Sequence, residues 1–204
     1  MLVVSAALNI FLLFRGQSVS SGVNVIGVID GDTIVLEGKS RVRLRYIDAP
    51  EKGLCGYDQA TRELKKLALG KSVRIEETIP DQYGRGMALV YAGNTLINRE
   101  MLAGGWARYH HDITSKTDEL KAAADAAKNE PRGIYRMCQS KDVPDTPSCI
   151  IKGNIDKNSN ARTYYLPDCA QYKFTVVEKD MGENWFCTEK EALAAGFTKA
   201  KTCK

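Results

Sequence analysis

Three short clusters contain the charged side chains of this chain that could do chemistry: the first at residues 29–33, the second at 43–51 and the third at 81–86. The five groups of interest, in chain order, are Asp32, Arg43, Asp48, Glu51 and Arg85. Two carboxylates can hold a hard cation, a third can act as a base, and two guanidiniums can grip a phosphate. These are the groups that metal-assisted hydrolysis of a phosphodiester needs.

Asp32 and Asp48 are the candidate metal ligands. Asp32 follows Gly31 at the start of one expected strand and Asp48 ends another, so a hairpin could bring both carboxylates to one cation. Calcium accepts carboxylate, carbonyl and water oxygens in loose geometry, which suits such a pair. The alternative for Asp32 is a purely local role, because aspartate is common in turns.

Glu51, Arg43 and Arg85 would act on the phosphate. Pro50 fixes the backbone before Glu51, so this carboxylate is aimed and could take a proton from a water that attacks phosphorus. Two guanidiniums can bind a phosphate bidentately and neutralise charge in the transition state, which lysine does not reproduce. The alternative for Glu51 is a solvated loop glutamate, the usual position of this residue type.

Other polar residues near the clusters receive smaller roles. Tyr83 could stack on a base or donate to a phosphate oxygen. Arg41 and Arg45 are expected on the solvated face of a strand. His110 and His111 have no nucleophile motif beside them, so they are expected at the surface and not as a catalytic pair.

Length and composition set broad limits. The chain has 204 residues, enough for one or two domains, and its hydrophobic content of 44% excludes a disordered chain. The net charge of +4 permits a nucleic-acid partner without indicating one. Residues 2–14 are almost wholly apolar but short for a membrane span, and small residues follow them. We therefore expect residues 1–21 to be a cleaved signal peptide, with an uncleaved membrane anchor or a buried helix as alternatives.

A signal peptide would make the chain secreted or periplasmic, where disulfides persist. The six cysteines are Cys55, Cys138, Cys149, Cys169, Cys187 and Cys203. Their even number fits disulfides, and no pair has the C-x2-C spacing of a zinc knuckle. Buried free thiols are the alternative if the chain stays in the cytosol.

Residues 22–138 are expected to form one domain of the α+β class. The expected strands are 23–29, 33–37, 41–47, 73–78 and 87–91, and the expected helices are 58–69, 96–103 and 117–128. In the third strand apolar residues alternate with arginines, so one face should join a core and the other should meet water or a ligand. Five strands with a helix between the third and fourth predict a small Greek-key β-barrel of the OB type, with three helices in all.

The remainder of the chain is expected to be a linker and a small second unit. Residues 139–148 carry two prolines among polar residues, which is typical of a linker, and residues 149–204 contain four cysteines. The elements expected in this unit are strands at 162–166 and 174–177 and a helix from the capping box Thr188-x-x-Glu191 to Gly196. So small an α+β core needs cross-links, which the cysteines can supply.

Five motifs follow one another along residues 23–136, more than half of the chain. They are Ile29-Asp30-Gly31-Asp32-Thr33, Val42-Arg43-Leu44, Ile47-Asp48-Ala49-Pro50-Glu51, Tyr83-Gly84-Arg85-Gly86 and Pro131-Arg132-Gly133-Ile134-Tyr135. Each motif alone is weak, but their order and spacing are specific and resemble the staphylococcal-type thermonuclease family. The resemblance implies an OB barrel with three helices and a calcium-dependent endonuclease that acts on DNA and RNA and leaves 3′-phosphates.

The resemblance also carries a role to each candidate residue. The calcium ligands would be Asp32, Asp48 and the backbone carbonyl of Ala49, which stands where the family often has threonine. The general base and the two phosphate clamps would be Glu51, Arg43 and Arg85. The loop at Cys55 departs from the family, and a disulfide to Cys138 could join it to the end of the domain.

The last unit resembles small cysteine-containing modules attached to some bacterial nuclease-like proteins. The matching words are Ile151-Lys152-Gly153-Asn154-Ile155, Tyr164-Tyr165-Leu166-Pro167 and Trp185-Phe186-Cys187. Some relatives of this unit look like the zinc-binding end of DNA alkylation-repair proteins, so zinc is the alternative to disulfides among its four cysteines. Trp185 and Tyr172 could bind a partner, but core packing is the expected use.

The function expected from the sequence is that of a secreted or periplasmic calcium-dependent nuclease. DNA and RNA are its expected substrates, and no stable protein partner is predicted. The alternative is a nucleic-acid-binding or scaffold module, because thermonuclease-like barrels can lose catalysis. Such loss normally removes carboxylates or arginines, and all five positions are filled here.

Overall fold

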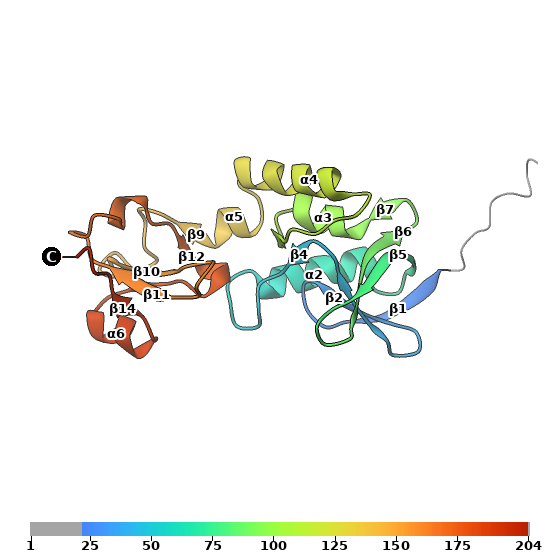
Figure 1. The fold of residues 1–204 in the computed structure, drawn as a ribbon, viewed down its shortest axis with the longest axis horizontal. Helices are drawn as coiled ribbons and strands as arrows, with labels where there is room; N and C mark the ends of the chain where they lie inside the picture. Colours follow the sequence, from blue (N-terminus) through green and yellow to red (C-terminus); the bar gives the residue numbers. More distant parts are fainter. Residues whose placement is uncertain (1–21, 204) are drawn as a thin grey trace, which may run out of the picture.

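The structure is a computed structural model that describes residues 22–203, and Figure 1 shows two units side by side. The signal peptide expected at residues 1–21 lies outside the described residues. Within residues 22–203 no helix is both long enough and apolar enough to cross a membrane.

A ring of hydrogen-bonded strands forms the centre of the N-terminal unit. The strands of the ring are β1 (Val23–Val28), β2 (Thr33–Leu36), β3 (Arg41–Leu44), β5 (Ser72–Pro80) and β6 (Gly86–Ala92). Their order is β3-β2-β1-β5-β6, and β3 also pairs with β6 in parallel, so the order returns to its first strand. A short strand, β7 (Thr95–Leu96), extends the sheet beside β6. The α+β class is confirmed, and the closed ring of pairings is what a five-stranded barrel requires.

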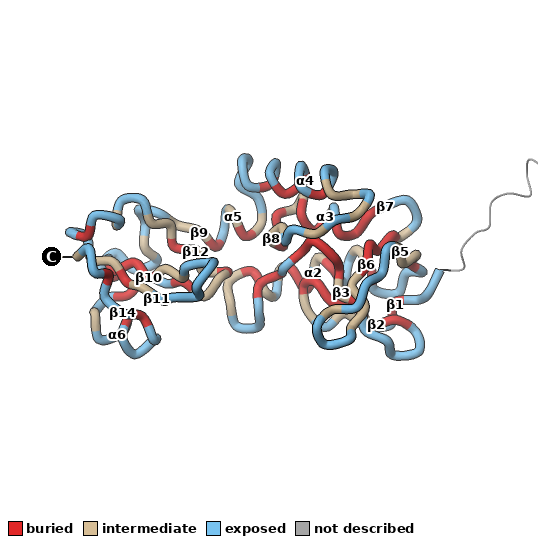
Figure 2. Tube along the Cα trace, viewed as in Figure 1, coloured by how far each residue is buried: buried red, intermediate tan, exposed pale blue. Residues whose placement is uncertain are grey.

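All three expected helices are present, with bounds that differ from the expected ones by one residue at most. They are α2 (Tyr57–Ala68), α3 (Ile97–Ala103) and α4 (Thr117–Asn129), and a single turn, α5 (Ile134–Met137), follows. Each contributes fully buried side chains to one core, such as Leu64, Met101 and Leu120. Figure 2 shows these buried faces of the helices turned toward the strands.

The third strand ends earlier than the alternating pattern predicts. It was expected to run to residue 47, but β3 stops at Leu44, and Tyr46 has a positive φ of 68°. The next two residues form a separate strand, β4 (Ile47–Asp48), which pairs with β8 (Arg108–Tyr109). Buried Asn98 stabilises this turn, because its side-chain amide donates to the Arg45 carbonyl at 2.9 Å. The break therefore places Asp48 on a different ladder from β3.

Arg45 corrects a second expectation from the same segment. Arg41 is exposed as expected, but Arg45 is only 5% exposed and does not lie on a solvated face. Its Nε and Nη2 donate to the two Asp112 carboxylate oxygens, both at 2.6 Å, and its Nη1 donates to the Glu77 carbonyl at 2.7 Å. The turn after Leu44 takes Arg45 off the strand, so the alternation that predicted its exposure no longer applies.

A four-stranded sheet organises the C-terminal unit. Its strands, in sheet order, are β13 (Trp185–Phe186), β10 (Ile151–Ile155), β11 (Arg162–Tyr165) and β14 (Thr198–Lys199). Helix α6 (Glu189–Ala194) begins as expected, because the Thr188 hydroxyl accepts a hydrogen bond from the Glu191 N–H. Trp185 is 7% exposed and Tyr172 packs against it, so both belong to the core of this unit.

The strand expected at 174–177 is wrong. Phe174 ends a 3-10 helix, η2 (Tyr172–Phe174), and only Val177 enters a strand, β12 (Val177–Glu178). The N–H groups of Phe174 and Thr175 both donate to the Gln171 carbonyl, so local turn hydrogen bonds replace a ladder here. A 3-10 helix, η3 (Lys179–Met181), follows β12.

Three disulfides cross-link the chain, and no cysteine among the described residues is free. They join Cys55 to Cys138, Cys149 to Cys187 and Cys169 to Cys203. The expected use of cysteines in disulfides is confirmed, and the four cysteines of the C-terminal unit are paired with one another and not arranged around zinc.

The two units are tied together directly after Cys138. The first two residues of the expected linker form β9 (Gln139–Ser140), which pairs with β12 of the C-terminal unit. The Lys179 N–H donates to the Cys138 carbonyl at 2.8 Å, and the Trp185 indole N–H donates to the Ser140 hydroxyl at 2.6 Å. The start of the predicted linker is therefore part of the contact between the units.

Candidate active site

Close packing fixes Asp32 at the start of β2. A Cβ added at Gly31 would lie 2.6 Å from the Ala49 Cβ and 2.7 Å from the Ala60 Cβ, so only glycine lets this turn approach both. Asp32 is 3% exposed. One of its carboxylate oxygens accepts from the Thr33 hydroxyl at 2.9 Å and the other from the Ala49 N–H at 3.1 Å. The carboxylate is therefore held in one orientation.

Arg43 brings the two candidate metal ligands together. Its Nη1 lies 2.9 Å from Asp32 Oδ1 and its Nη2 lies 2.7 Å from Asp48 Oδ1. One guanidinium thus spans the gap between a buried carboxylate and one that is 49% exposed. The antiparallel β2–β3 hairpin sets Thr33 opposite Arg43, which brings the Arg43 guanidinium to Asp32, and the turn after β3 brings Asp48 to the same guanidinium.

The electrostatics of Asp32 favour a neighbouring cation. Burial, which outweighs the opposing effect of Arg43 and is aided by the nearby Asp30, raises the pKa of its carboxyl to about 7. A buried carboxylate is costly unless it is paired, so additional positive charge beside it is stabilising. Its oxygens and those of Asp48 are hard donors of the kind that calcium prefers. The donor set therefore fits such an ion, with the remaining positions left to a carbonyl and to water.

Two carboxylates are too few side-chain ligands to fill the coordination shell of a metal ion. Within residues 22–203 no group of three or more His, Cys, Asp or Glu side chains is placed to hold a metal. Ala49 follows Asp48 directly and is 7% exposed, so its backbone carbonyl is the nearest main-chain donor in the sequence. Any metal here must complete its coordination with main-chain and water oxygens.

Glu51 lies beside this pair, after Pro50, and is exposed. Its carbonyl accepts the Leu54 N–H at 3.0 Å, which closes a tight turn. Glu51 lines a small pocket of about 120 Å³ together with Asp48 from its own unit and Met181 from the C-terminal unit. In the described part of the chain, no hydrogen bond or ion pair engages its carboxylate, so it is open to a water molecule in that pocket.

Asp81 organises the loop that carries Arg85, a role that the sequence did not assign. One Asp81 carboxylate oxygen accepts the N–H groups of Tyr83 and Arg85, both at 2.8 Å, and the other lies 2.7 Å from the Arg85 Nε. The Arg85 side chain stays 36% exposed, and its Cζ lies 5.4 Å from the centre of the Tyr83 ring. An aspartate two to four residues before such donors is a known turn signal, and it could have been recognised in Asp81-Gln82-Tyr83-Gly84.

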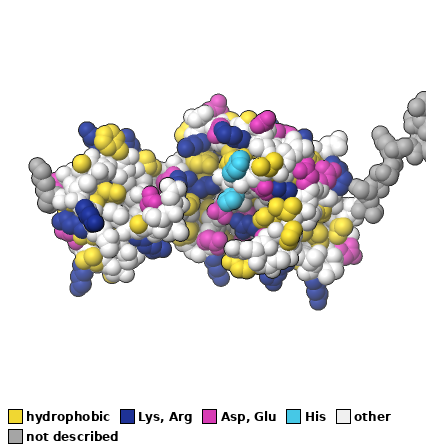
Figure 3. All heavy atoms as spheres, viewed as in Figure 1, with side chains coloured by type: hydrophobic (Ala, Val, Ile, Leu, Met, Phe, Trp, Pro, Cys, Tyr) yellow, Lys and Arg dark blue, Asp and Glu magenta, His cyan; other side chains and the backbone are white. Residues whose placement is uncertain are grey.

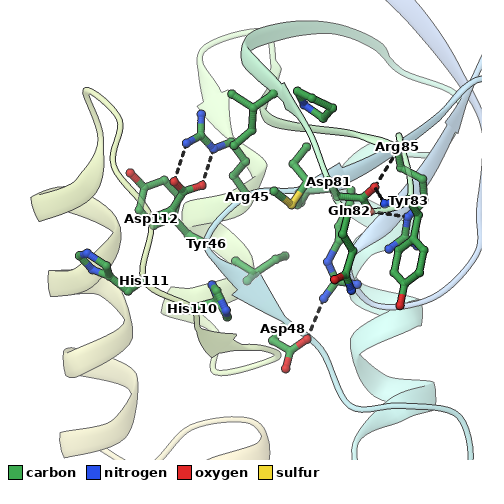
Figure 4. Close-up of a pocket in the computed structure, with 16 residues that line it drawn as sticks. Arg45, Tyr46, Asp48, Asp81, Gln82, Tyr83, Arg85, His110, His111 and Asp112 are labelled. Atoms are coloured by element: carbon green, nitrogen blue, oxygen red, sulfur yellow. Dashed lines mark hydrogen bonds and ion pairs between the residues drawn. The ribbon is translucent and has the colours of Figure 1, made fainter.

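Arg43, Asp48 and Arg85 line a pocket of about 650 Å³, which we call the active-site pocket, whereas Asp32 and Ala49 do not line it. In Figure 4, Asp48, Tyr83 and Arg85 lie on one side of it. The opposite side holds the two histidines and the buried Arg45–Asp112 pair. His110 and His111 are exposed as expected, but they line this pocket, which the sequence did not indicate. Glu51 lines the smaller pocket next to it, and Asp48 borders both.

Comparison with known proteins assigns the chain to a family. Residues 41–137 match the family model described as staphylococcal nuclease homologue. An uncharacterized endonuclease of Escherichia coli O157:H7 is 33% identical over 115 residues, which cover 54% of this chain and 74% of that protein. The chain therefore belongs to the staphylococcal nuclease homologue family. Membership implies the OB fold, with which the closed ring of strands agrees.

Other relatives are similar over a smaller share of their length. A probable staphylococcal-like nuclease of Oryza sativa subsp. japonica is 35% identical over 115 residues, 56% of this chain and 30% of the relative. A micrococcal nuclease of Shigella flexneri is 40% identical over 82 residues, 39% of this chain and 43% of the relative. The chain thus spans only about 30% of the length of the rice relative.

Proposed function

We propose that this protein is a calcium-dependent endonuclease that hydrolyses phosphodiester bonds in DNA and RNA. The observation that carries the proposal is the bridge from Arg43 to Asp32 and Asp48, which holds two carboxylates and a guanidinium together beside the small pocket that Glu51 lines with Asp48. Nuclease relatives support the reaction class. A catalytically weak nucleic-acid-binding module is the alternative, and the experiment below separates the two.

Calcium binding and removal of the water proton would fall to different residues. Asp32, Asp48 and the Ala49 carbonyl would hold calcium, which when bound supplies positive charge beside the phosphate and makes a nearby water easier to deprotonate. Glu51, open to solvent in the adjoining pocket, would take a proton from the water that attacks phosphorus.

Arg43 and Arg85 would neutralise the charge that develops on the phosphate oxygens. Both guanidiniums already lie at the active-site pocket, each fixed by a carboxylate that leaves part of the fork exposed. Tyr83 is 74% exposed at the mouth of this pocket and would contact the substrate by stacking or by its hydroxyl. The new P–O bond forms to water while the bond to the 5′-oxygen breaks, so the products carry a 3′-phosphate and a 5′-hydroxyl.

We also propose that the protein works outside the cytoplasm, either secreted or in a periplasm. Three disulfides in a chain of this size are typical of an oxidising compartment. Secretion would bring the enzyme to extracellular or incoming nucleic acid, and a membrane association would require an uncleaved N-terminal segment.

The chemistry of the product ends tests the reaction. Single-stranded DNA and RNA oligonucleotides labelled at either end would be digested by the full chain in calcium, and the fragments analysed by mass spectrometry. We expect 3′-phosphate and 5′-hydroxyl ends from both substrates. Fragments with 5′-phosphates would overturn the proposed direction of attack, and intact substrate bound by folded protein would favour the binding module.

A further inference from the structure

A second pocket, which we call the junction pocket, lies between the two units. Its volume is about 460 Å³, within the range of sites that hold small ligands. From the nuclease unit it is lined by residues of β4, β8 and α4 and by Tyr135, and from the C-terminal unit by Ile155, Lys157, Asn160 and Met181. Nothing in the proposed reaction uses this pocket.

The junction pocket is next to the active-site pocket. Asp48 and His110 line both, so the two hollows meet at the candidate metal ligand. Figure 3 shows the histidines at the middle of this face, with Lys and Arg side chains beside them toward the C-terminal unit. A polymer that occupies the active-site pocket and continues past Asp48 therefore enters the junction pocket.

The contact between the units is fixed by a buried ion-pair network. Arg108, the β8 partner of Asp48, donates from Nε and Nη2 to the two oxygens of Asp180 at 2.6 and 3.0 Å. The Asp180 side chain is 1% exposed, and Glu178 accepts from Arg108 at 3.2 Å. Fork-shaped pairs of this kind hold both partners in one orientation. The wall supplied by the C-terminal unit is thus a stable part of the cleft.

Two lysines give the junction pocket a positive character. Lys128, at the end of α4, is exposed and makes no ion pair with the residues that the structure describes. Lys157 is 57% exposed and lies 2.8 Å from Glu178, a carboxylate that also has Arg108 as a partner. Glu178 keeps Arg108 as a partner, so Lys157 can exchange Glu178 for an anion without leaving that carboxylate unpaired.

The two carboxylates of this pocket do not cancel the lysines. Asp48 is paired with Arg43 at 2.7 Å, and Asp125 is paired with Lys121 at 2.6 Å. Neither Arg43 nor Lys121 lines the pocket, so the acidic groups have their own partners outside it. Lys128 and Lys157 are therefore the two lysines that an anion in the junction pocket meets.

The loop that carries Lys157 is preorganised. One Asp156 carboxylate oxygen accepts the N–H groups of Asn158 and Ser159 and the Ser159 hydroxyl, at 2.7 to 3.2 Å. These hydrogen bonds lower the pKa of Asp156 and keep it ionised. The turn closes with the Asn160 N–H on the Asp156 carbonyl at 2.8 Å. Little ordering of this backbone is needed when Lys157 binds a ligand.

Apolar and aromatic side chains also line the junction pocket. Tyr109, Tyr135, Ile155 and Met181 all line the pocket. The Arg108 guanidinium lies 5.7 Å from the centre of the Tyr135 ring, which keeps that ring in place. Aromatic and apolar side chains beside cations are the features that bind single-stranded nucleic acids without sequence preference.

We propose that the junction pocket is a binding subsite for nucleotides of a single-stranded polynucleotide that extends beyond the scissile phosphate, with Lys128 and Lys157 as its phosphate contacts. The proposal rests on the nuclease function proposed above and assigns a role to the C-terminal unit, which supplies half of the subsite. The enzyme then grips long single strands more tightly than short ones.

The salt dependence of binding tests this subsite. The full chain with Glu51→Gln would be titrated with a fluorescent 12-nucleotide single-stranded DNA in calcium at several salt concentrations. The logarithm of the association constant decreases linearly with the logarithm of the salt concentration, and each phosphate contact to a single strand contributes roughly 0.7 to the steepness of that line. We therefore expect the line to be less steep by about 1.4 in a Lys128→Ala, Lys157→Ala double variant. Lys190→Ala in α6, which lines neither pocket, is the matched control and should keep the slope unchanged. An unchanged slope in the double variant would overturn the proposal.

A kinetic comparison separates failure of the subsite from failure of the nuclease. With wild-type Glu51, the ratio of kcat/KM for the 12-mer to kcat/KM for a trinucleotide should fall about tenfold in the double variant, the effect of weakening one or two charged contacts. The ratio should keep its wild-type value in Lys190→Ala. An equal loss on both substrates would contradict an extended subsite, whereas cleavage of neither substrate by the wild-type chain would overturn the proposed function itself.

Discussion

At the scale of single residues, the site is a set of charges that hold one another in place. Arg43 spans Asp32 and Asp48, and Asp81 holds Arg85, so each guanidinium is oriented before any substrate arrives. Preorganised donors of this kind account for much of the rate enhancement in phosphoryl chemistry. The fork of arginine matters as much as its charge, because one guanidinium must contact two partners at once.

Replacing either clamp by lysine tests this point. We expect Arg43→Lys and Arg85→Lys each to lower kcat on single-stranded DNA by about 10²–10³, as loss of a transition-state donor does. Arg41→Lys, on the exposed end of β3, is the matched control and should change kcat less than about twofold, within the usual range for surface substitutions. Near-normal turnover in both lysine variants would remove the clamp role.

At the scale of elements, the break between β3 and β4 decides where the candidate site residue Asp48 lies. Asn98, which is fully buried in α3, holds that break. Its amide donates to the carbonyls of Arg45 and Ala88, and its carbonyl accepts the Val90 N–H. Every polar atom of this side chain is therefore matched to main chain that would otherwise be unpaired in the core.

Removing these hydrogen bonds should cost considerable stability. We expect Asn98→Leu to lower the free energy of unfolding by about 3 kcal/mol, because buried main-chain groups are left without partners. Asn129→Leu, at the exposed end of α4, is the control and should change it by less than about 0.5 kcal/mol. Urea denaturation measures both, and similar stabilities for the two variants would contradict the role of Asn98.

The alternating pattern of residues 41–47 shows where sequence reasoning succeeded and where it stopped. Periodicity correctly predicted buried Leu44 and Tyr46, and helix signals placed all three long helices. It could not reveal the turn at Tyr46, because that turn depends on Asn98, which is distant in the sequence. Arg45 was misplaced for the same reason: its partner Asp112 lies 67 positions later.

The sequence predicted which charged residues make up the candidate site, but not which other residues line the pocket around them. The types and spacing of the five charged residues indicated one pocket, and the structure brings Arg43 into contact with both aspartates. The histidines escaped notice because no local motif marks their place at the pocket, whereas Asp81 acts through a local turn signal that was overlooked. The contact of the C-terminal unit with this site has no signal in the sequence.

At the scale of the whole molecule, the C-terminal unit contacts the nuclease unit through a cluster of buried charges. Glu183, 2% exposed, accepts hydrogen bonds from Asn154 Nδ2 and from the N–H groups of Ile155 and Glu178, all at 2.7 to 2.8 Å. Burial nevertheless raises the pKa of Glu183 to about 7. The C-terminal unit therefore contains a group that titrates near neutral pH.

This raised pKa predicts how stability depends on pH. The folded state keeps the Glu183 proton up to about pH 7, whereas the unfolded state loses it near 4.5, the ordinary pKa of a glutamate side chain. The protonated Glu183 carboxyl therefore stabilises the folded state at low pH. This contribution to the free energy of unfolding falls as the pH rises from about 4.5 to about 7. In chelator, we expect the Tm of Glu183→Gln to depend less steeply on pH between 5 and 7.5 than the Tm of the wild type.

Glu63→Gln, at an exposed ion pair on α2, is the control for the pH series and should follow the wild-type curve. Calorimetry or circular dichroism would give Tm at each pH. A Glu183→Gln curve parallel to the wild-type curve would show that this carboxyl does not titrate between pH 5 and 7.5.

The most direct test of the whole account is digestion of single-stranded DNA by the purified full chain, with calcium and then with chelator. Glu51→Gln, purified identically, controls for contaminating nuclease. We predict cleavage by the wild type in calcium alone and a kcat lower by about 10²–10⁴ for Glu51→Gln, the usual contribution of a general base, with calcium affinity by calorimetry unchanged. Equal rates for the two proteins, or cleavage that persists in chelator, would contradict a calcium-dependent nuclease that uses Glu51 as its base.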